Sequence, residues 1–264
     1  MKNILELKDS EITLKNKIAI LKFNRDDVRN ALTGTKIIND IISTINFLNM
    51  NQKYSVLIIT GNGSCFSSGG NIKEMRKKNS SFSGKVEEIE RKYRYGIQLI
   101  PKYMVKLEIP VIAAINGPAI GAGLDLACMC DFRVMANTAF LAENFIDLGI
   151  IPGDGGAYFL QRIIGYQKAA ELTFTGRRVY AEEAKIMGLI IDKFEKKDLI
   201  KKTLDFAKII AKKPPLALRY TKRLMMAADK MHLDDFLEFS ALFQGISHNQ
   251  ADHKIAVKKI LGKK

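Results

Sequence analysis

Three segments of the sequence repeat one order of elements: an apolar run, a loop rich in glycine, and the first turn of a helix. The loops are residues 61–70, 116–121 and 148–156. Short apolar runs bounded by such loops are typical of buried strands. Strands that alternate with helices favour an α/β fold with a mostly parallel sheet. The spacing of the three segments is too uneven to establish a sequence repeat.

The remaining elements divide the chain into two parts. A strand pair at 12–14 and 18–23 and a helix at 37–48 precede the first glycine-rich loop, whereas helices dominate after residue 195. We expect these helices at 196–211, 215–229, 234–247 and 252–261. We therefore predict a core over residues 1–195 and a helical oligomerisation region over residues 196–264. The helical region carries more large apolar side chains than it can bury alone, and packing on a neighbouring subunit would cover them.

The net charge of +14 has two interpretations. Such a surplus attracts nucleic acid or another polyanion, or it is spread over a solvated surface. The sequence has no dense arginine-rich block and no RNA-binding signature, so a nucleic-acid partner is not favoured. The content of 47% hydrophobic and 27% charged residues is ordinary for a soluble globular protein.

The most membrane-like segment is residues 109–130. It contains Asn116, Pro118 and Asp125, so it predicts a buried strand, a loop and a helix rather than a membrane span. The first residues lack the apolar region of a secretory signal. We expect a cytoplasmic protein with no membrane contact.

The sequence lacks the residue patterns that several classes of enzyme require. The histidines, His232, His248 and His253, all fall in the predicted helical region, away from any nucleophile motif, which argues against a hydrolase triad. Residues 121–123 lack the third glycine of a dinucleotide-binding fingerprint. The three cysteines include no C-x-x-C pair and indicate neither a disulfide framework nor a zinc site.

Backbone amides at two of the loops offer a way to bind a negative charge. Gly70 ends the first loop, and Ala122 follows the second loop at the start of the expected helix. The first amides of a helix have no intrahelical acceptor and lie at the positive end of the helix dipole. Two such N–H groups that converge on one oxygen form an oxyanion hole. Loops of this kind can also serve only to pack helices on strands.

Three ordered motifs, at residues 58–75, 114–131 and 148–156, resemble those of the enoyl-CoA hydratase/isomerase, or crotonase, family. The similarity covers nearly the whole chain. It implies a superhelix of stacked ββα turns with a C-terminal helical region that builds homotrimers, often paired into hexamers. It also implies an acyl-CoA thioester as substrate and no metal or redox cofactor, since coenzyme A is part of the substrate.

The resemblance assigns roles to one segment and one further residue. In the family, the residues corresponding to Gly70 and Ala122 donate the two N–H groups that hold the thioester oxygen. The segment of Gly70, Asn71, Ile72 and Lys73 lines the acyl-CoA site in the family. Lys73 alone is equally consistent with a solvated helix residue.

Carboxyl groups decide the reaction in this family. Its hydratases use two glutamates that together hold and activate water. The first corresponds to Asp125, whereas an ungapped alignment places Phe145 at the second position. Glu143 lies two residues earlier and would serve only after a shift in register. Because phenylalanine cannot carry a proton, ordinary hydration lacks its second acid.

Asp154, in the third loop, is the candidate replacement. It lies within one residue of the place where several isomerases of the family carry their acid, and one base suffices to move a double bond. Burial would raise the pKa of this carboxyl toward neutrality. Asp154 and Asp125 could instead only cap the helices beside them. We predict that both are catalytic in an isomerase of enoyl-CoA in fatty acid metabolism, with enoyl-CoA hydration or a non-catalytic or RNA-binding role as alternatives.

Overall fold

A six-stranded sheet forms the centre of the computed structural model, which describes residues 5–80 and 82–262. The strands lie in the order β1 (Ser10–Lys15), β2 (Ile18–Phe23), β3 (Val56–Gly61), β4 (Val111–Ile115), β6 (Phe132–Ala136) and β9 (Asp192–Phe194). β1 and β2 form an antiparallel hairpin, and every other neighbouring pair is parallel. The mostly parallel sheet predicted from the sequence is therefore confirmed.

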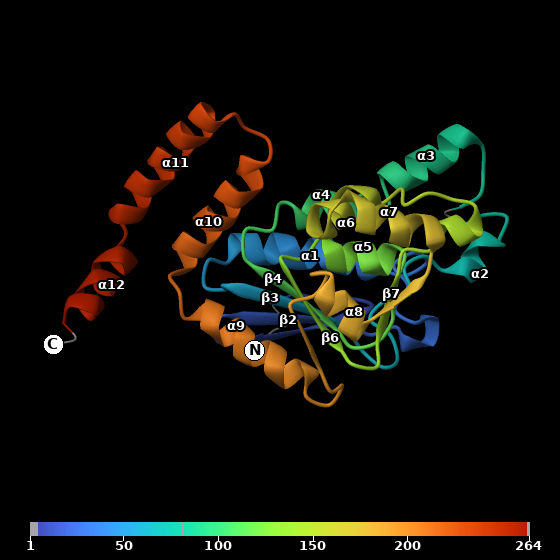
Figure 1. Cartoon of the computed structure of the whole chain (residues 1–264), viewed down its shortest axis with the longest axis horizontal. Coiled ribbons are helices and arrows are strands. Elements are labelled where there is room, and N and C mark those ends of the chain that lie inside the picture. The colour runs from blue at the N-terminus through green and yellow to red at the C-terminus, as the bar shows by residue number, and fades with distance from the viewer. Residues whose placement is uncertain (1–4, 81, 263–264) are drawn as a thin grey trace.

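Helices cover the sheet, and this explains why its central strands are so apolar (Figure 1). α1 (Ile37–Met50) packs on β2, and α9 (Leu199–Ala211) packs on β2, β3 and β4. Every residue of β3 and β4 is buried as a result. β4 and α5 (Ala122–Cys128) account for the segment whose sequence is most membrane-like. Within the described residues, no helix combines the length and the apolar character that a bilayer crossing requires.

A second, three-stranded sheet joins two of the glycine-rich loops. It consists of β5 (Ala119–Ile120), β7 (Phe140–Ala142) and β8 (Arg178–Tyr180). β5 is parallel to β7, and a parallel bridge links Ser67 to Ala119. The prediction of a loop throughout 116–121 is thus wrong at β5, because two paired residues are too few to leave a pattern in the sequence. This pairing brings the loop after β3 beside the loop after β4.

Six further helices surround the two sheets. They are α2 (Ile72–Met75), α3 (Val86–Arg94), α4 (Leu99–Met104), α6 (Gly156–Ile164), α7 (Tyr166–Thr175) and α8 (Ala181–Ile186). The sequence patterns do not predict α3, α4 and α7. α3 buries no residue, and α4 and α7 bury two each, so none of the three has a wide apolar stripe.

The last three helices form an arm that stands away from the body (Figure 1). The arm consists of α10 (Pro215–Ala228), α11 (Leu233–His248) and α12 (Ala251–Leu261). Of the predicted helical region, α9 thus packs on the sheet, whereas the arm exposes large apolar side chains. These include Leu237, Leu242, Ile255 and Ile260. The assembly that such a surface would serve stays a prediction.

Two buried cations attach the arm to the body. Arg219 Nη1 donates a hydrogen bond to Glu108 at 2.9 Å. Lys222 Nζ donates to the backbone oxygen of Ile109 at 2.9 Å and to the carboxylate of Asp131 at 2.7 Å. Because buried charges need partners of this kind, α10 has a defined position on the body.

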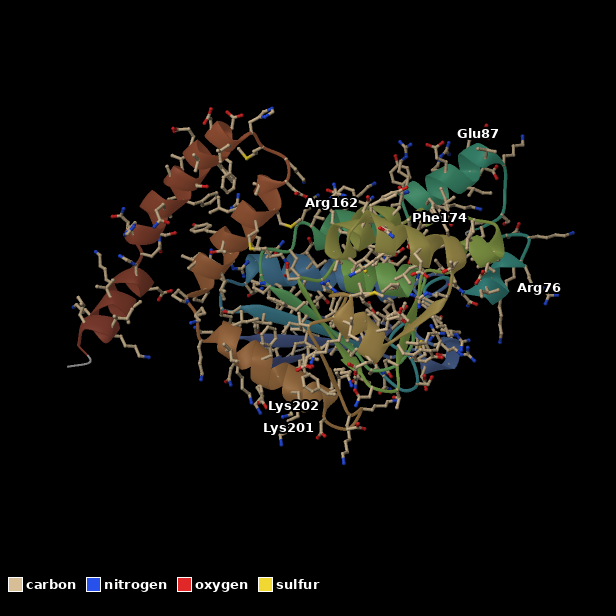
Figure 2. All side chains as sticks on the ribbon, in the orientation of Figure 1. Arg76, Glu87, Arg162, Phe174, Lys201 and Lys202 are labelled. Atoms are coloured by element: carbon tan, nitrogen blue, oxygen red, sulfur yellow. The ribbon has the colours of Figure 1, made fainter. Side chains whose placement is uncertain are left out.

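Basic side chains on α9 lie in solvent. Figure 2 shows Lys201 and Lys202 projecting from α9 away from the body, and both are exposed. These two side chains agree with the interpretation of the positive net charge as a solvated surface.

Gly123, in the first turn of α5, lets this helix lie against the loop at Ser67. A Cβ atom at residue 123 would lie 2.3 Å from the backbone oxygen of Ser67. We expect Gly123→Ala to lower the free energy of unfolding by about 1–3 kcal/mol, because the backbone must shift to admit the methyl group. Denaturant unfolding followed by circular dichroism measures this change.

The matched control for that variant is Gly245→Ala in α11, where a Cβ atom would meet no atom within 4 Å. This change should be neutral or stabilising, since alanine is the better helix former. Equal stabilities of the two variants would contradict the close approach at Gly123.

Candidate functional site

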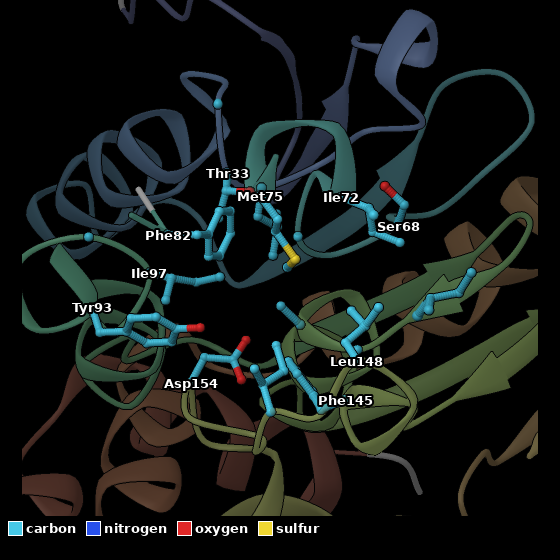
Figure 3. Close-up of a pocket in the computed structure, with 18 of the residues that line it drawn as sticks. Thr33, Ser68, Ile72, Met75, Phe82, Tyr93, Ile97, Phe145, Leu148 and Asp154 are labelled. Carbon is cyan, nitrogen blue, oxygen red and sulfur yellow. The ribbon is translucent and has the colours of Figure 1, made fainter. Parts of the chain in front are cut away.

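A cavity of about 190 Å³ lies where the loops after β3 and β4 face α2, α3 and the turn before α6 (Figure 3). Its polar lining residues are Thr33, Thr35, Ser68, Lys92, Tyr93, Asn144 and Asp154. The apolar lining residues are more numerous: Leu32, Ile38, Ile72, Met75, Phe82, Ile97, Ile120, Ala122, Phe145, Leu148 and Ile150. An apolar chamber with a few convergent polar groups is the usual form of a small-molecule site.

Gly70 and Ala122 both line this cavity, so the structure brings the two predicted amides together. A Cβ atom at Gly69 would lie 2.8 Å from the backbone nitrogen of Ala122, so only glycine allows the loops to approach this closely. Gly121 turns the chain into α5 with a φ of 50°, which also favours glycine. Across residues 5–80 and 82–262, neither the Gly70 N–H nor the Ala122 N–H has a protein acceptor.

The segment after Gly70 contributes one side chain to the cavity. Ile72 lines it, as Figure 3 shows, whereas Asn71 and Lys73 do not. Asn71 caps α2 instead, because its side chain accepts a hydrogen bond from the Lys73 N–H at 3.1 Å. The Lys73 side chain is exposed, in agreement with a solvated helix residue.

Three buried carboxyl groups lie behind the two loops, and we call Asp125, Glu143 and Asp154 the carboxyl cluster. They are 0%, 1% and 3% exposed. α5 carries Asp125, Glu143 follows β7, and Asp154 precedes α6. Asp154 is the member of the cluster that lines the cavity (Figure 3). The structure therefore places both predicted acids together and adds Glu143 to them.

Burial governs the protonation of the carboxyl cluster. Loss of solvation raises the pKa of Asp125 well above its usual value, and the charges of Asp154 and Glu143 raise it further. Burial also raises the pKa of Asp154, although a hydrogen bond with Asp125 opposes this. Burial raises the pKa of Glu143 to about 8, although a hydrogen bond with Asp125 opposes the rise. The cluster therefore retains protons at neutral pH.

Helix capping does not account for the two aspartates. The N-cap residue of α6 is Gly155 and that of α5 is Gly121, and neither cap has a side-chain hydrogen bond. Asp154 Oδ1 and both oxygens of Asp125 have no donor in the described part of the protein. Capping is thus excluded as the reason for these carboxyl groups.

Phe145, which the ungapped alignment places at the second acid position, lies at the cavity. Its ring lines the cavity and lies 3.4 Å from the position of a Cβ atom at Gly121. Glu143 does not line the cavity, so no shift in register places it there. The chain turns between these two residues, because β7 ends at Ala142 and a short 3₁₀ helix begins at Phe145, so strand alternation does not relate their side chains.

Tyr93 is a cavity residue that the sequence analysis misses. Figure 3 shows its hydroxyl pointing toward the Asp154 carboxyl. Burial and the nearby Asp154 charge raise the pKa of the Tyr93 hydroxyl, so it stays protonated. Tyr93 belongs to α3, whose charged sequence gives no pattern from which its place could be predicted.

The described residues contain no group of three or more histidine, cysteine, aspartate or glutamate side chains placed to hold a metal ion. The carboxyl cluster is thus not arranged as a metal site. That the protein works without metal or redox cofactor stays a prediction.

Comparisons with known proteins agree on one family. A family model described as enoyl-CoA hydratase/isomerase matches residues 13–263. The enoyl-CoA isomerase/hydratase fer4 of Mycosarcoma maydis is 36% identical over 211 residues, which are 76% of this chain and 74% of that protein. The short-chain-enoyl-CoA hydratase of Clostridium acetobutylicum is 28% identical over 98% of this chain and 97% of that protein.

The fold agrees with solved structures of the same kind. The crystal structure of an enoyl-CoA hydratase from Bacillus anthracis superposes with a TM-score of 0.88 at 28% identity, covering 97% of each chain. The predicted crotonase-like fold is therefore confirmed. Because the family model spans nearly the whole chain and the fold agrees, this protein is an enzyme of the enoyl-CoA hydratase/isomerase, or crotonase, family.

Proposed function

We propose that this enzyme moves the double bond of an enoyl-CoA and that Asp154 is its base. One observation carries the proposal: Asp154 is the carboxyl of the cluster that faces the cavity. Phe145, which by resemblance corresponds to the second acid of the family's hydratases, lines the same cavity and cannot carry a proton. The names of the relatives include both isomerases and hydratases, so they do not choose between the reactions.

The proposed reaction needs one base and one anion-binding site. The Asp154 carboxylate takes a proton from the carbon next to the thioester carbonyl of a 3-enoyl-CoA. The electron pair of that C–H bond forms the new double bond of a dienolate, whose negative charge lies on the thioester oxygen. The N–H groups of Gly70 and Ala122 donate hydrogen bonds to this oxygen. Protonated Asp154 then returns the proton two carbons further along the chain, giving the 2-enoyl-CoA.

The cavity supports this assignment in two ways. Its apolar lining accommodates an acyl chain and keeps water away from the dienolate. The segment of Gly70 to Lys73 leads from the cavity to the surface, where the exposed Lys73 suits the phosphates of coenzyme A. We propose that this segment binds the acyl-CoA and that Asp125 acts on the reaction through Asp154.

The arm supports a proposed assembly as a homotrimer or hexamer. Its exposed apolar side chains, among them Leu242 and Ile260, would be covered by neighbouring subunits. We also propose that the enzyme acts in the cytoplasm and without metal or redox cofactor, since the reaction above requires none. Sedimentation of the purified enzyme tests the assembly.

Product analysis tests the proposed reaction. The enzyme is incubated with 3-enoyl-CoA and 2-enoyl-CoA thioesters of several lengths, and products are separated by chromatography and mass. We expect 2-enoyl-CoA from the 3-enoyl substrates at a rate well above any addition of water. A gain of 18 mass units as the main outcome would show hydration and overturn the proposal.

A further inference from the structure

The carboxyl cluster contains one group that the proposed reaction does not use. Glu143 is 1% exposed and does not line the cavity. Its Oε1 atom lies 2.3 Å from the position of a Cβ atom at Gly156, and Asp125 Oδ1 lies 2.2 Å from the same position. The side chains of Glu143 and Asp125 therefore meet at the start of α6, where glycine leaves room for both. Asp154 lies two residues before Gly156.

Hydrogen-bond donors are missing around these carboxyl groups. Both oxygens of Asp125, both oxygens of Glu143 and one oxygen of Asp154 are buried without a donor among the described residues. A carboxylate needs donors, whereas a protonated carboxyl is itself a donor. The three groups can thus satisfy one another only if the cluster keeps protons.

The other groups near Glu143 do not supply a positive charge. Cys128 on α5 interacts with Glu143, but burial raises the pKa of its thiol to about 12, so it is neutral. Arg133, which faces Cys128, donates its hydrogen bonds to the backbone oxygens of residues 127, 130 and 189. Tyr93 faces Asp154 and is neutral as well. Lys92 lines the cavity, but its Nζ donates to the backbone oxygens of Ser80 at 2.9 Å and Ser83 at 2.6 Å.

We propose that Glu143 is a positioning residue: it keeps a proton that it donates to Asp125, so that Asp125 donates its own proton to Asp154 and leaves Asp154 as the ionised carboxylate. This inference rests on the proposed role of Asp154 as the base. The direction of these two hydrogen bonds follows from where the carboxyl groups lie, because Asp154 lines the cavity while Asp125 and Glu143 lie behind it. A chain of two donated hydrogen bonds then fixes the Asp154 carboxylate toward the substrate.

The proposal predicts how kcat/KM depends on pH. Burial raises the pKa of Glu143 to about 8. Glu143 therefore holds its proton at pH 7 and loses it as the pH rises through about 8. Ionised Glu143 is an acceptor and draws the Asp125 proton away from Asp154. Asp154 then lacks the hydrogen bond that orients it, and kcat/KM should fall on the alkaline side.

Two variants separate the hydrogen bond from the titration. Glu143→Gln keeps a donor to Asp125 but cannot ionise, whereas Glu143→Leu has a similar size and no donor. For the wild-type enzyme, we expect kcat/KM to fall by at least about threefold between pH 7 and pH 9.5. The Gln variant should keep its pH 7 value at pH 9.5, and the Leu variant should be low at both. An alkaline fall in the Gln variant equal to that of the wild type would overturn the proposal.

Unfolding measurements provide a readout that does not need activity. The pKa of Glu143 is higher in the folded protein than its usual value of 4.5, so folding is favoured while Glu143 is protonated. This contribution is complete below pH 4.5 and is lost as the pH rises through about 8. The Tm of the wild type should therefore fall relative to that of Glu143→Gln between pH 5 and pH 9. Parallel curves would show that Glu143 holds no proton and would refute the proposal.

These readouts also distinguish this proposal from the proposed function. If product analysis shows water addition, the assignment as an isomerase fails, but the pH profile and the unfolding curves still report on Glu143. If the curves of wild type and Glu143→Gln coincide while isomerisation is observed, the role of Glu143 fails alone.

Discussion

Asp154→Asn is expected to abolish most of the turnover of 3-enoyl-CoA thioesters. Asparagine has nearly the same shape but cannot accept the proton of the substrate. Positioned acid–base groups contribute about 10²–10⁴-fold to rates. We therefore expect kcat to fall by at least tenfold. Initial rates at saturating substrate measure the effect. KM should change little, because the cavity keeps its shape.

The matched control for this variant is Asp147→Asn. Asp147 is an exposed carboxyl seven residues earlier that does not line the cavity. It should retain the wild-type rate. Thermal unfolding of Asp154→Asn excludes misfolding as the cause, and its Tm should not drop, because the variant removes a carboxyl whose ionised form burial disfavours. Turnover equal to the wild type would remove Asp154 from the mechanism.

Ala122→Pro should have the second large effect. Ala122 is the first residue of α5, where proline suits the helix because the N–H there has no intrahelical acceptor. The substitution replaces this N–H by the Cδ of the proline ring, at a position where the helix itself tolerates proline. Loss of one donor of an oxyanion hole costs about 3–4 kcal/mol of transition-state stabilisation, which corresponds to about 10²–10³-fold in kcat. Kinetics with a 3-enoyl-CoA measure the loss.

Ala181→Pro is the control with the same chemical change. Ala181 is the first residue of α8 and, like Ala122, is 3% exposed, but it does not line the cavity. The two proline variants should therefore have similar Tm values and very different rates. Similar rates would show that the Ala122 N–H does not stabilise the dienolate and that the oxyanion hole lies elsewhere.

Local patterns in the sequence predict the elements that build the site. Glycine-rich loops after apolar runs give the positions of Gly70 and Ala122, and the structure places both at one cavity. The two aspartates also follow from such patterns, since each lies at the start of a helix after a glycine-rich loop. The relation between these segments is long-range, but in parallel strands the loops at the carboxyl ends meet on the same edge of the sheet.

Contacts between distant segments explain what the sequence analysis misses. Glu143 joins the carboxyl cluster because β7 pairs with β5, a pairing of two residues that no periodicity reveals. Tyr93 reaches the cavity from α3, a helix without a buried residue and hence without an apolar stripe. In both cases tertiary packing, rather than local preference, decides where the side chain lies.

The cavity and the arm are built from separate stretches of the chain. Every residue that lines the cavity falls between Leu32 and Asp154, whereas the arm begins at Pro215. Under the proposed assembly through the arm, substitutions that accumulate in the arm during evolution would change how subunits associate without altering the residues that line the cavity. In such a molecule, the mode of assembly and the choice of substrate can change independently of each other during evolution.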